Sequence, residues 1–228
     1  MQKVLIVAKS KEKKSFLKKE LQKSGFKIVR NKPDFVVSVG GDGTYLVAER
    51  KFPSVPKLLI RDSKVCKKCV GEDHLELFKK IKNFDFKLEE HSKIEGFFKK
   101  KSFVATNDIV IKAKLPNKAL RFEVYVNNQK VVGEIIGDGV VISTPFGSTG
   151  YYQSITNKNF KKGIGVAFNN PTKKQTPLLL KETDIIKVKI TTGLGILAHD
   201  NNTKILKLKP KSEVIVKKYK NSAYTIRL

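Results

Sequence analysis

The chain has 228 residues, of which 40% are hydrophobic; it is long enough to bury a core in one large or two small domains, and too apolar to be disordered. No apolar run reaches the roughly 20 residues of a membrane-spanning helix, and the apolar part of residues 1–7 is too short for a signal peptide, so we expect a cytoplasmic protein without a membrane partner. The 47 basic and 21 acidic residues give a formal net charge of +26.

The first third of the chain alternates between strand and helix patterns. Strands are predicted at residues 3–8, 26–29, 35–39 and 57–60, and helices at residues 11–24, 45–50 and 73–82. Phe16, Leu17 and Leu21 form the apolar face of the first helix, which Gly25 caps. This alternation predicts a small, mostly parallel sheet covered by helices.

From about residue 84 onward, short alternating runs follow one another closely. Strands are predicted at residues 84–90, 94–99, 102–105, 108–112, 120–126, 130–136, 140–143, 163–168, 184–191, 196–199, 204–208, 213–217 and 223–228. Asn127-Asn128 and Asn201-Asn202 suit hairpin tips because asparagine tolerates positive φ angles. Many short strands favour a sandwich or an open barrel.

Together these patterns predict an α+β protein of two domains. Residues 1–88 form a small Rossmann-like α/β domain, and residues 89–228 form an all-β, sandwich-like domain.

The positive charge is spread along the whole chain rather than gathered in one arm. No nucleic-acid-binding module signature occurs, and aromatic residues are not interleaved with arginines. Nucleic acid is therefore not favoured as the main partner, although we expect non-specific binding at low salt. A basic surface also suits a polyanionic substrate such as a nucleotide.

Cys66 and Cys69 form an isolated Cys-Lys-Lys-Cys sequence in a charged region. A structural zinc site needs four ligands, and no second Cys or His pair lies at a suitable spacing. We expect two reduced thiols without a functional role.

A glycine-rich turn follows the predicted strand at residues 35–39. Gly40, Gly41 and Gly43 surround Asp42, and Thr44 comes directly before a helix pattern. A strand, a glycine turn and a helix present backbone N–H groups to a phosphate. A carboxylate is a poor phosphate ligand, so Asp42 is expected to bind a metal ion or to accept a proton.

Residues 137–151 interrupt the rhythm of strands with a turn that contains Pro145 and Gly147. Ser148 or Thr149 is expected to cap the helix that follows, which leaves its N–H groups facing a ligand. An ordinary capped turn is the alternative. It does not explain why Asp138, several hydroxyl residues and Tyr151 gather in one turn.

These two stretches resemble the NAD kinase family, in which Gly-Gly-Asp-Gly-Thr precedes a later Asp-Gly…Ser-Thr-Pro…Gly-Ser-Thr…Tyr segment. Asn107-Asp108 is similar to the family's Asn-Glu pair, and residues 200–202 are similar to its Asp-Gly-Gln hairpin. The resemblance extends from about residue 34 to the end. It implies phosphorylation of the adenosine ribose 2′-hydroxyl of NAD, with ATP as the donor and a divalent metal, Mg²⁺ or Mn²⁺, whose ligands we do not assign. It also implies a homo-oligomer, either a dimer or a tetramer.

The resemblance implies a site in a cleft between the two domains. Asp42 takes the hydroxyl proton and contacts NAD together with Gly43. Phosphates are bound by Gly40, Gly41, Gly43 and Thr44, and NAD by Asn107, Asp108, Asp138, Ser148, Thr149, Gly150, Tyr151, Ser154 and Asp200.

Each assignment has a structural alternative. Asn107 could be a turn residue before a strand, Asp200 a hairpin corner and Tyr151 a packing residue.

This chain departs from the family pattern in four places. Residues 61–66 replace a glycine-containing segment, which puts donor binding in question; Asp108 replaces Glu, and Gly150 replaces Ala. The sequence ends at Leu228, where the family normally continues with a helix. Two alternatives remain open: a catalytically altered nucleotide-binding or nucleic-acid-associated relative, and a lipid kinase that shares the first turn.

Overall fold

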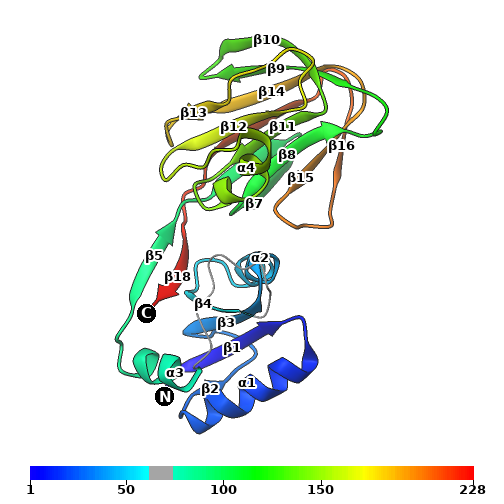
Figure 1. The fold of residues 1–228 in the computed structure, drawn as a ribbon. Helices are drawn as coiled ribbons and strands as arrows, with labels where there is room; N and C mark the ends of the chain where they lie inside the picture. Colours follow the sequence, from blue (N-terminus) through cyan, green and yellow to red (C-terminus); the bar gives the residue numbers. More distant parts are fainter. Residues whose placement is uncertain (62–73) are drawn as a thin grey trace. The chain divides into compact units, whose positions relative to one another are not determined.

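The computed structural model describes residues 1–61 and 74–228, which form a strand-rich, mixed α/β protein as predicted (Figure 1). The chain divides into two compact units. Unit 1 contains Met1–His91 and Ser222–Leu228, and unit 2 contains Ser92–Asn221. Cys66 and Cys69, and the departure from the family pattern after Arg61, lie outside the described residues.

Unit 1 contains one six-stranded sheet in the order β2-β1-β3-β4-β18-β5. Its elements are β1 (Lys3–Ala8), α1 (Lys11–Lys23), β2 (Lys27–Ile28), β3 (Phe35–Gly40), α2 (Asp42–Lys51), β4 (Lys57–Arg61), α3 (His74–Lys82), β5 (Lys87–His91) and β18 (Ala223–Arg227). All neighbouring pairs are parallel except β18 with β5, which is antiparallel. The mostly parallel sheet predicted from the alternation of strands and helices is therefore present.

Helices cover both faces of this sheet because its strands carry apolar side chains on both sides. Leu17 and Leu21 of α1 and Phe78 of α3 pack against one face. Ala48 of α2 packs against Leu5 on the other face. The sheet is thereby fixed from both sides, and the turn between β3 and α2 lies at the carboxyl end of its strands.

Unit 2 contains two six-stranded sheets, with orders β10-β9-β14-β17-β6-β7 and β13-β12-β11-β8-β15-β16. The strands are β6 (Ile94–Phe98), β7 (Lys101–Ala105), β8 (Asp108–Ala113), β9 (Leu120–Val126), β10 (Gln129–Gly137), β11 (Gly139–Ser143), β12 (Ile164–Asn169), β13 (Leu178–Leu180), β14 (Ile186–Thr192), β15 (Gly195–His199), β16 (Leu206–Leu208) and β17 (Glu213–Lys218). A 3₁₀ turn, η1 (Gly147–Thr149), and a short helix, α4 (Tyr151–Thr156), follow β11.

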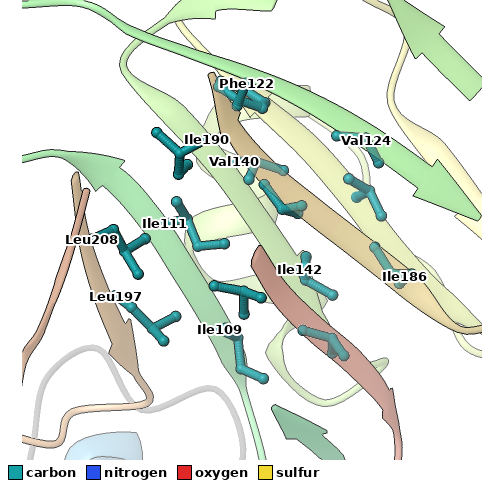
Figure 2. Close-up of a cluster of buried hydrophobic side chains, with 14 of the residues drawn as sticks. Ile109, Ile111, Phe122, Val124, Val140, Ile142, Ile186, Ile190, Leu197 and Leu208 are labelled. Atoms are coloured by element: carbon teal, nitrogen blue, oxygen red, sulfur yellow. The ribbon is translucent and has the colours of Figure 1, made fainter. Parts of the chain in front are cut away.

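The two sheets of unit 2 share one apolar core, part of which is drawn in Figure 2. Phe122 and Val124 come from the first sheet, and Ile109, Ile111 and Val140 come from the second. These strands alternate buried and more exposed side chains, which is the pattern that predicted a sandwich. On the outer face of the second sheet, Tyr152 of α4 packs against β11 and β12.

The structure differs from the predicted domain division at the C-terminal end. Residues 222–228 were predicted in the second domain, but β18 inserts between β4 and β5 of unit 1. Alternation along a strand predicts the strand but not its partner, and Ile226 fits the apolar core of unit 1. The three-residue strand β13 was not predicted.

None of the described helices combines the length and hydrophobicity that crossing a bilayer would require.

Candidate functional site

The glycine turn, defined here as residues 40–44, connects β3 to α2 in unit 1. Gly40 has a φ angle of +150°, and a Cβ atom there would lie 2.3 Å from Thr44 Oγ1. Gly41 is the N-cap residue of α2, and Asp42 is the first residue of the helix. The turn therefore places one carboxylate at the positive end of a helix dipole, beside N–H groups that can bind an anion.

Thr44 lies beneath this turn and is only 3% exposed. Its backbone N–H donates to the carbonyl of Gly41 (2.9 Å). None of the described residues forms a hydrogen bond with its hydroxyl group. A buried hydroxyl of this kind is a candidate ligand-binding group, because buried polar atoms normally have partners.

The second group of predicted residues lies in unit 2, where the segment Thr106–Asn107 joins β7 to β8 (residues 106–108 are called the 106–108 segment below). Asp200, directly after β15, accepts hydrogen bonds from the backbone N–H groups of Thr106 (3.0 Å), Asn107 (2.7 Å) and Asp108 (3.3 Å). The structure thus brings Asn107, Asp108 and Asp200 together, although they are far apart in the sequence.

The turn after β11 holds the other side of this segment. Thr144 Oγ1 donates to the carbonyl of Thr106 (2.5 Å) and accepts from the N–H of Gly147 (3.1 Å). The N–H of Thr144 donates to the carbonyl of Asn107 (2.9 Å). The Asn107 side-chain oxygen is buried, and no described residue donates a hydrogen bond to it. This amide oxygen is therefore a second candidate ligand-binding atom.

Asp108 is a buried carboxylate, 7% exposed, beside Asp200. Burial, and secondarily the negative charge of Asp200, raises the pKa of Asp108 to about 7. Burial also raises the pKa of Asp200, but its hydrogen bonds from the backbone and the nearby His199 oppose the rise. Burial and the charge of Asp200 thus both favour the protonated form of Asp108.

Tyr151, the first residue of α4, lies close enough to Asp138 and Asp108 for both of their charges to affect its hydroxyl group. Burial, followed by the charges of Asp138 and Asp108, raises the pKa of the Tyr151 hydroxyl. The same hydroxyl accepts a hydrogen bond from the Asn169 side chain (3.0 Å), and Asp138 accepts one from Asn170 (3.4 Å). Sheet pairing explains why Asp138 lies near Asn169 and Asn170, because Gly139, the residue after Asp138, pairs with Asn169.

Of the remaining predicted residues, Ser148, Thr149 and Gly150 lie in the turn before α4, and Ser154 lies in α4 itself. Ser148 is buried; its hydroxyl donates to the carbonyl of Pro145 (2.7 Å) and accepts a hydrogen bond from the N–H of Phe160 (3.3 Å). Gly150, rather than Ser148 or Thr149, is the N-cap residue of α4, so the predicted side-chain cap is wrong. The chain folds back at Phe160, whose backbone forms hydrogen bonds with the Ser148 hydroxyl, so this hydroxyl does not cap α4. Thr149 is partly exposed, Gly150 is exposed, and the Ser154 hydroxyl donates to the carbonyl of Tyr151 (2.7 Å).

No three His, Cys, Asp or Glu side chains among the described residues gather in a way that could hold a metal ion. A magnesium ion that binds with a nucleotide needs only one or two protein carboxylates, since phosphates and water supply the other ligands. The carboxylate of Asp42 fits this requirement.

Sequence reasoning missed Thr144 and Asn169, and it gave Gly147 only a turn role. Thr144 was part of the noted Ser-Thr-Pro sequence, but its contact with Thr106 spans 38 residues. Asn169 ends an apolar strand and carries no local signal. Long-range contacts of this kind are determined by strand pairing.

Comparisons with known proteins show the family of this chain. Residues 106–228 match the family model of the ATP-NAD kinase C-terminal domain. The NAD kinase of Methanosphaera stadtmanae is 31% identical over 212 residues, which cover 88% of this chain and 76% of that protein.

Two solved structures share the fold. An NAD kinase from Archaeoglobus fulgidus in complex with ATP has a TM-score of 0.83 and 21% identity, covering 98% of this chain and 92% of that one. A yeast NADH kinase in complex with NADH has a TM-score of 0.90 and 19% identity, covering 100% and 84%. The family model covers more than half of the chain, and the Methanosphaera relative is matched along most of its length; this protein belongs to the NAD kinase family.

Proposed function

We propose that this protein is an NAD kinase that transfers the γ-phosphoryl group of ATP to the adenosine ribose 2′-hydroxyl of NAD, giving NADP and ADP. Family membership carries the proposal, because a relative named NAD kinase is 31% identical over most of both chains. The geometry of the glycine turn supports the assignment of roles.

In this proposal the glycine turn is the catalytic element. The N–H groups of Gly40, Gly41 and Gly43 and the hydroxyl of Thr44 hold the phosphates. Asp42 orients the 2′-hydroxyl and accepts its proton as the new P–O bond forms and the bond to ADP breaks. An aspartate is a weak base in water, so orientation is the larger part of its contribution.

Unit 2 supplies the NAD-binding groups in this proposal. Asn107 offers to the adenosine a side-chain oxygen that none of the described residues satisfies, and Asp108 offers a carboxyl group. Thr149, Gly150, Tyr151 and Ser154 line the adenosine pocket. Asp138 binds a ribose hydroxyl or the nicotinamide amide. Ser148 acts indirectly, because its hydroxyl already holds the turn.

The phosphoryl donor, the metal, the oligomeric state and the location are also proposals. The relative from Archaeoglobus binds ATP, and the yeast relative binds NADH. A divalent metal, Mg²⁺ or Mn²⁺, would neutralise charge on the transferring phosphoryl group. We propose a cytoplasmic dimer or tetramer.

The test of the proposal is replacement of Asp42 by Asn. We expect NADP formation from NAD, ATP and magnesium, followed with an NADP-specific dehydrogenase, to fall by about 10² to 10⁴-fold, because the proton acceptor is lost. NAD binding, measured by calorimetry, should remain detectable. Wild-type protein without NADP formation would overturn the function, and a fully active variant would remove Asp42 from its role.

Asp34 provides the matched control for this experiment. It is an exposed aspartate of unit 1 that accepts a hydrogen bond from the N–H of Lys3 (2.7 Å). Asp34→Asn makes the same chemical change outside the glycine turn, and we expect it to retain wild-type activity.

A lipid kinase, the alternative that the first turn left open, would need an apolar acceptor pocket. The groups gathered around Asn107 are two carboxylates, an amide and hydroxyls, which suit a sugar and a base instead. Tight NAD binding without turnover on ATP, another nucleoside triphosphate or polyphosphate would favour the catalytically altered relative.

A further inference from the structure

The carboxylate of Asp200 accepts hydrogen bonds from the backbone of the same chain. Its Oδ1 accepts hydrogen bonds from the N–H groups of Thr106 (3.1 Å), Asn107 (2.7 Å) and Asp108 (3.3 Å), and Oδ2 accepts a second one from Thr106 (3.0 Å). In return, the N–H of Asp200 donates to the carbonyl of Asp108 (2.9 Å). Asp200 adopts a φ angle of +47°, which turns the chain after β15 so that its side chain reaches these donors.

Three successive N–H groups that converge on one point cannot all be satisfied by strand pairing, which uses alternate groups on each side of a strand. Converging backbone N–H groups form an anion-binding concavity. In unit 2 a carboxylate of the same chain fills this concavity. The 106–108 segment therefore depends on Asp200 for its conformation.

The opposite side of the segment is held through its carbonyl groups. Thr144 binds the carbonyls of Thr106 and Asn107, and a Cβ atom at Gly147 would lie 2.1 Å from the Asn107 carbonyl oxygen. The backbone of Asn107 is thus fixed from two directions by residues distant in the sequence. Its side-chain oxygen, which no described residue satisfies, is the group left available to a ligand.

We propose that Asp200 is a positioning residue: its carboxylate gathers the N–H groups of the 106–108 segment and thereby orients Asn107 and Asp108 toward the dinucleotide. This inference rests on the proposed function, since it takes NAD as the ligand of Asn107. It assigns Asp200 an indirect role in place of the direct contact with NAD that the family resemblance implies.

The first test measures the backbone of the protein without NAD. Asp200→Asn replaces one acceptor oxygen by an NH₂ group that faces N–H donors. We expect the amide proton resonances of residues 106–108 to move upfield and to exchange faster with solvent. Unchanged resonances would overturn the proposal.

Asp200→Glu keeps the negative charge and provides a second test if Asp200→Asn fails to fold. Its carboxylate reaches further by one methylene, so we expect amide shifts and NAD turnover between those of wild type and Asp200→Asn. Glutamate and asparagine variants with equal amide shifts would contradict a role for the carboxylate charge.

The second test separates positioning from direct contact by a double-mutant cycle with Asn107→Ala. A misplaced binding group lowers kcat/KM for NAD by about 10²-fold. If Asp200 acts through the segment, the double variant should be no worse than the poorer single variant, and the KM for ATP should not change. Effects that multiply would show that Asp200 contacts NAD independently and would overturn the proposal.

Asp184 provides the matched control within unit 2. It also accepts hydrogen bonds from a backbone N–H, that of Lys181 (2.8 Å), and from the Asn127 side chain (2.9 Å). We expect Asp184→Asn to leave the amide resonances of residues 106–108 and the NAD kinetics unchanged. If wild-type protein forms no NADP, the proposed function fails, while the amide measurement still decides whether Asp200 holds the segment.

Discussion

A Cβ atom at Gly147 would lie 2.1 Å from the carbonyl oxygen of Asn107 and 2.5 Å from its carbonyl carbon. Both atoms belong to backbone that two strands hold in place, so neither can move away as a side chain could. The glycine is therefore required by close packing, and this packing lets Thr144 reach the 106–108 segment. The sequence shows a glycine in a turn, but not the distant backbone that it contacts.

Asp108 gives a prediction at the scale of one carboxyl group. Its pKa is about 7 in the folded protein and about 3.9 for a free aspartate, so between these pH values the folded state holds a proton that the unfolded chain has lost. The free energy of unfolding should therefore fall as pH rises through this window. This decrease in the free energy of unfolding, at most on the order of 4 kcal/mol, is complete above pH 7.

Asp108→Asn removes this titration, and urea unfolding at pH 5.5 and pH 8 measures the effect. We expect the variant to gain stability relative to wild type between the two pH values. Neighbouring titratable groups, namely Asp200, His199, Tyr151 and Asp138, are common to both proteins. Parallel pH profiles for the two proteins would contradict the assignment of the proton to Asp108.

At the scale of elements, α2 and β4 are joined by a buried ion pair that no sequence pattern indicated. Lys57 Nζ forms a hydrogen-bonded salt bridge with Glu49 and donates to the carbonyl of Phe52 (2.6 Å). Glu49 also accepts from the N–H of Ser54 (3.1 Å). Both side chains are almost fully buried, so each needs the other to compensate its charge.

Glu49→Gln should therefore destabilise unit 1 by about 3 kcal/mol, because it leaves the Lys57 charge buried without a carboxylate. Replacing both partners, Glu49→Leu with Lys57→Met, should recover most of this loss. Hydrogen exchange of the amides of β4 is the suitable measurement, since two units need not unfold in one step. A double variant as unstable as the single one would show that the ion pair itself stabilises the fold.

The order of strands in unit 1 is a second property that depends on contacts between distant elements. Residues 223–228 alternate like the preceding strands, so their pattern predicted another strand of the second domain. The structure instead pairs Thr225 with Lys57 of β4 and with Glu89 of β5. An alternating pattern identifies which face is apolar, and several sheets of one protein can accept the same face.

At the scale of the whole molecule, the net charge of +26 predicts non-specific binding to nucleic acid. Binding to a random DNA duplex should be detectable at 50 mM salt and weaker by about 10³-fold or more at 200 mM, because counterion release dominates it. A titration followed by fluorescence anisotropy, with heparin as a competitor, measures this. Binding that persists at 200 mM salt would favour the nucleic-acid-associated alternative.

The sequence by itself determined the strand and helix patterns, the glycine turn with Asp42 and the resemblance to NAD kinases. These properties are local, since periodicity and turn chemistry act within about ten residues. Only the tertiary structure decided that β18 completes unit 1, that Lys57 meets Glu49 inside it, and that Asp200 binds donors 92 to 94 residues away. Sheet pairing and burial create such contacts. The free energy of burying a charge or an N–H group depends on which distant residue the fold places beside it as a partner.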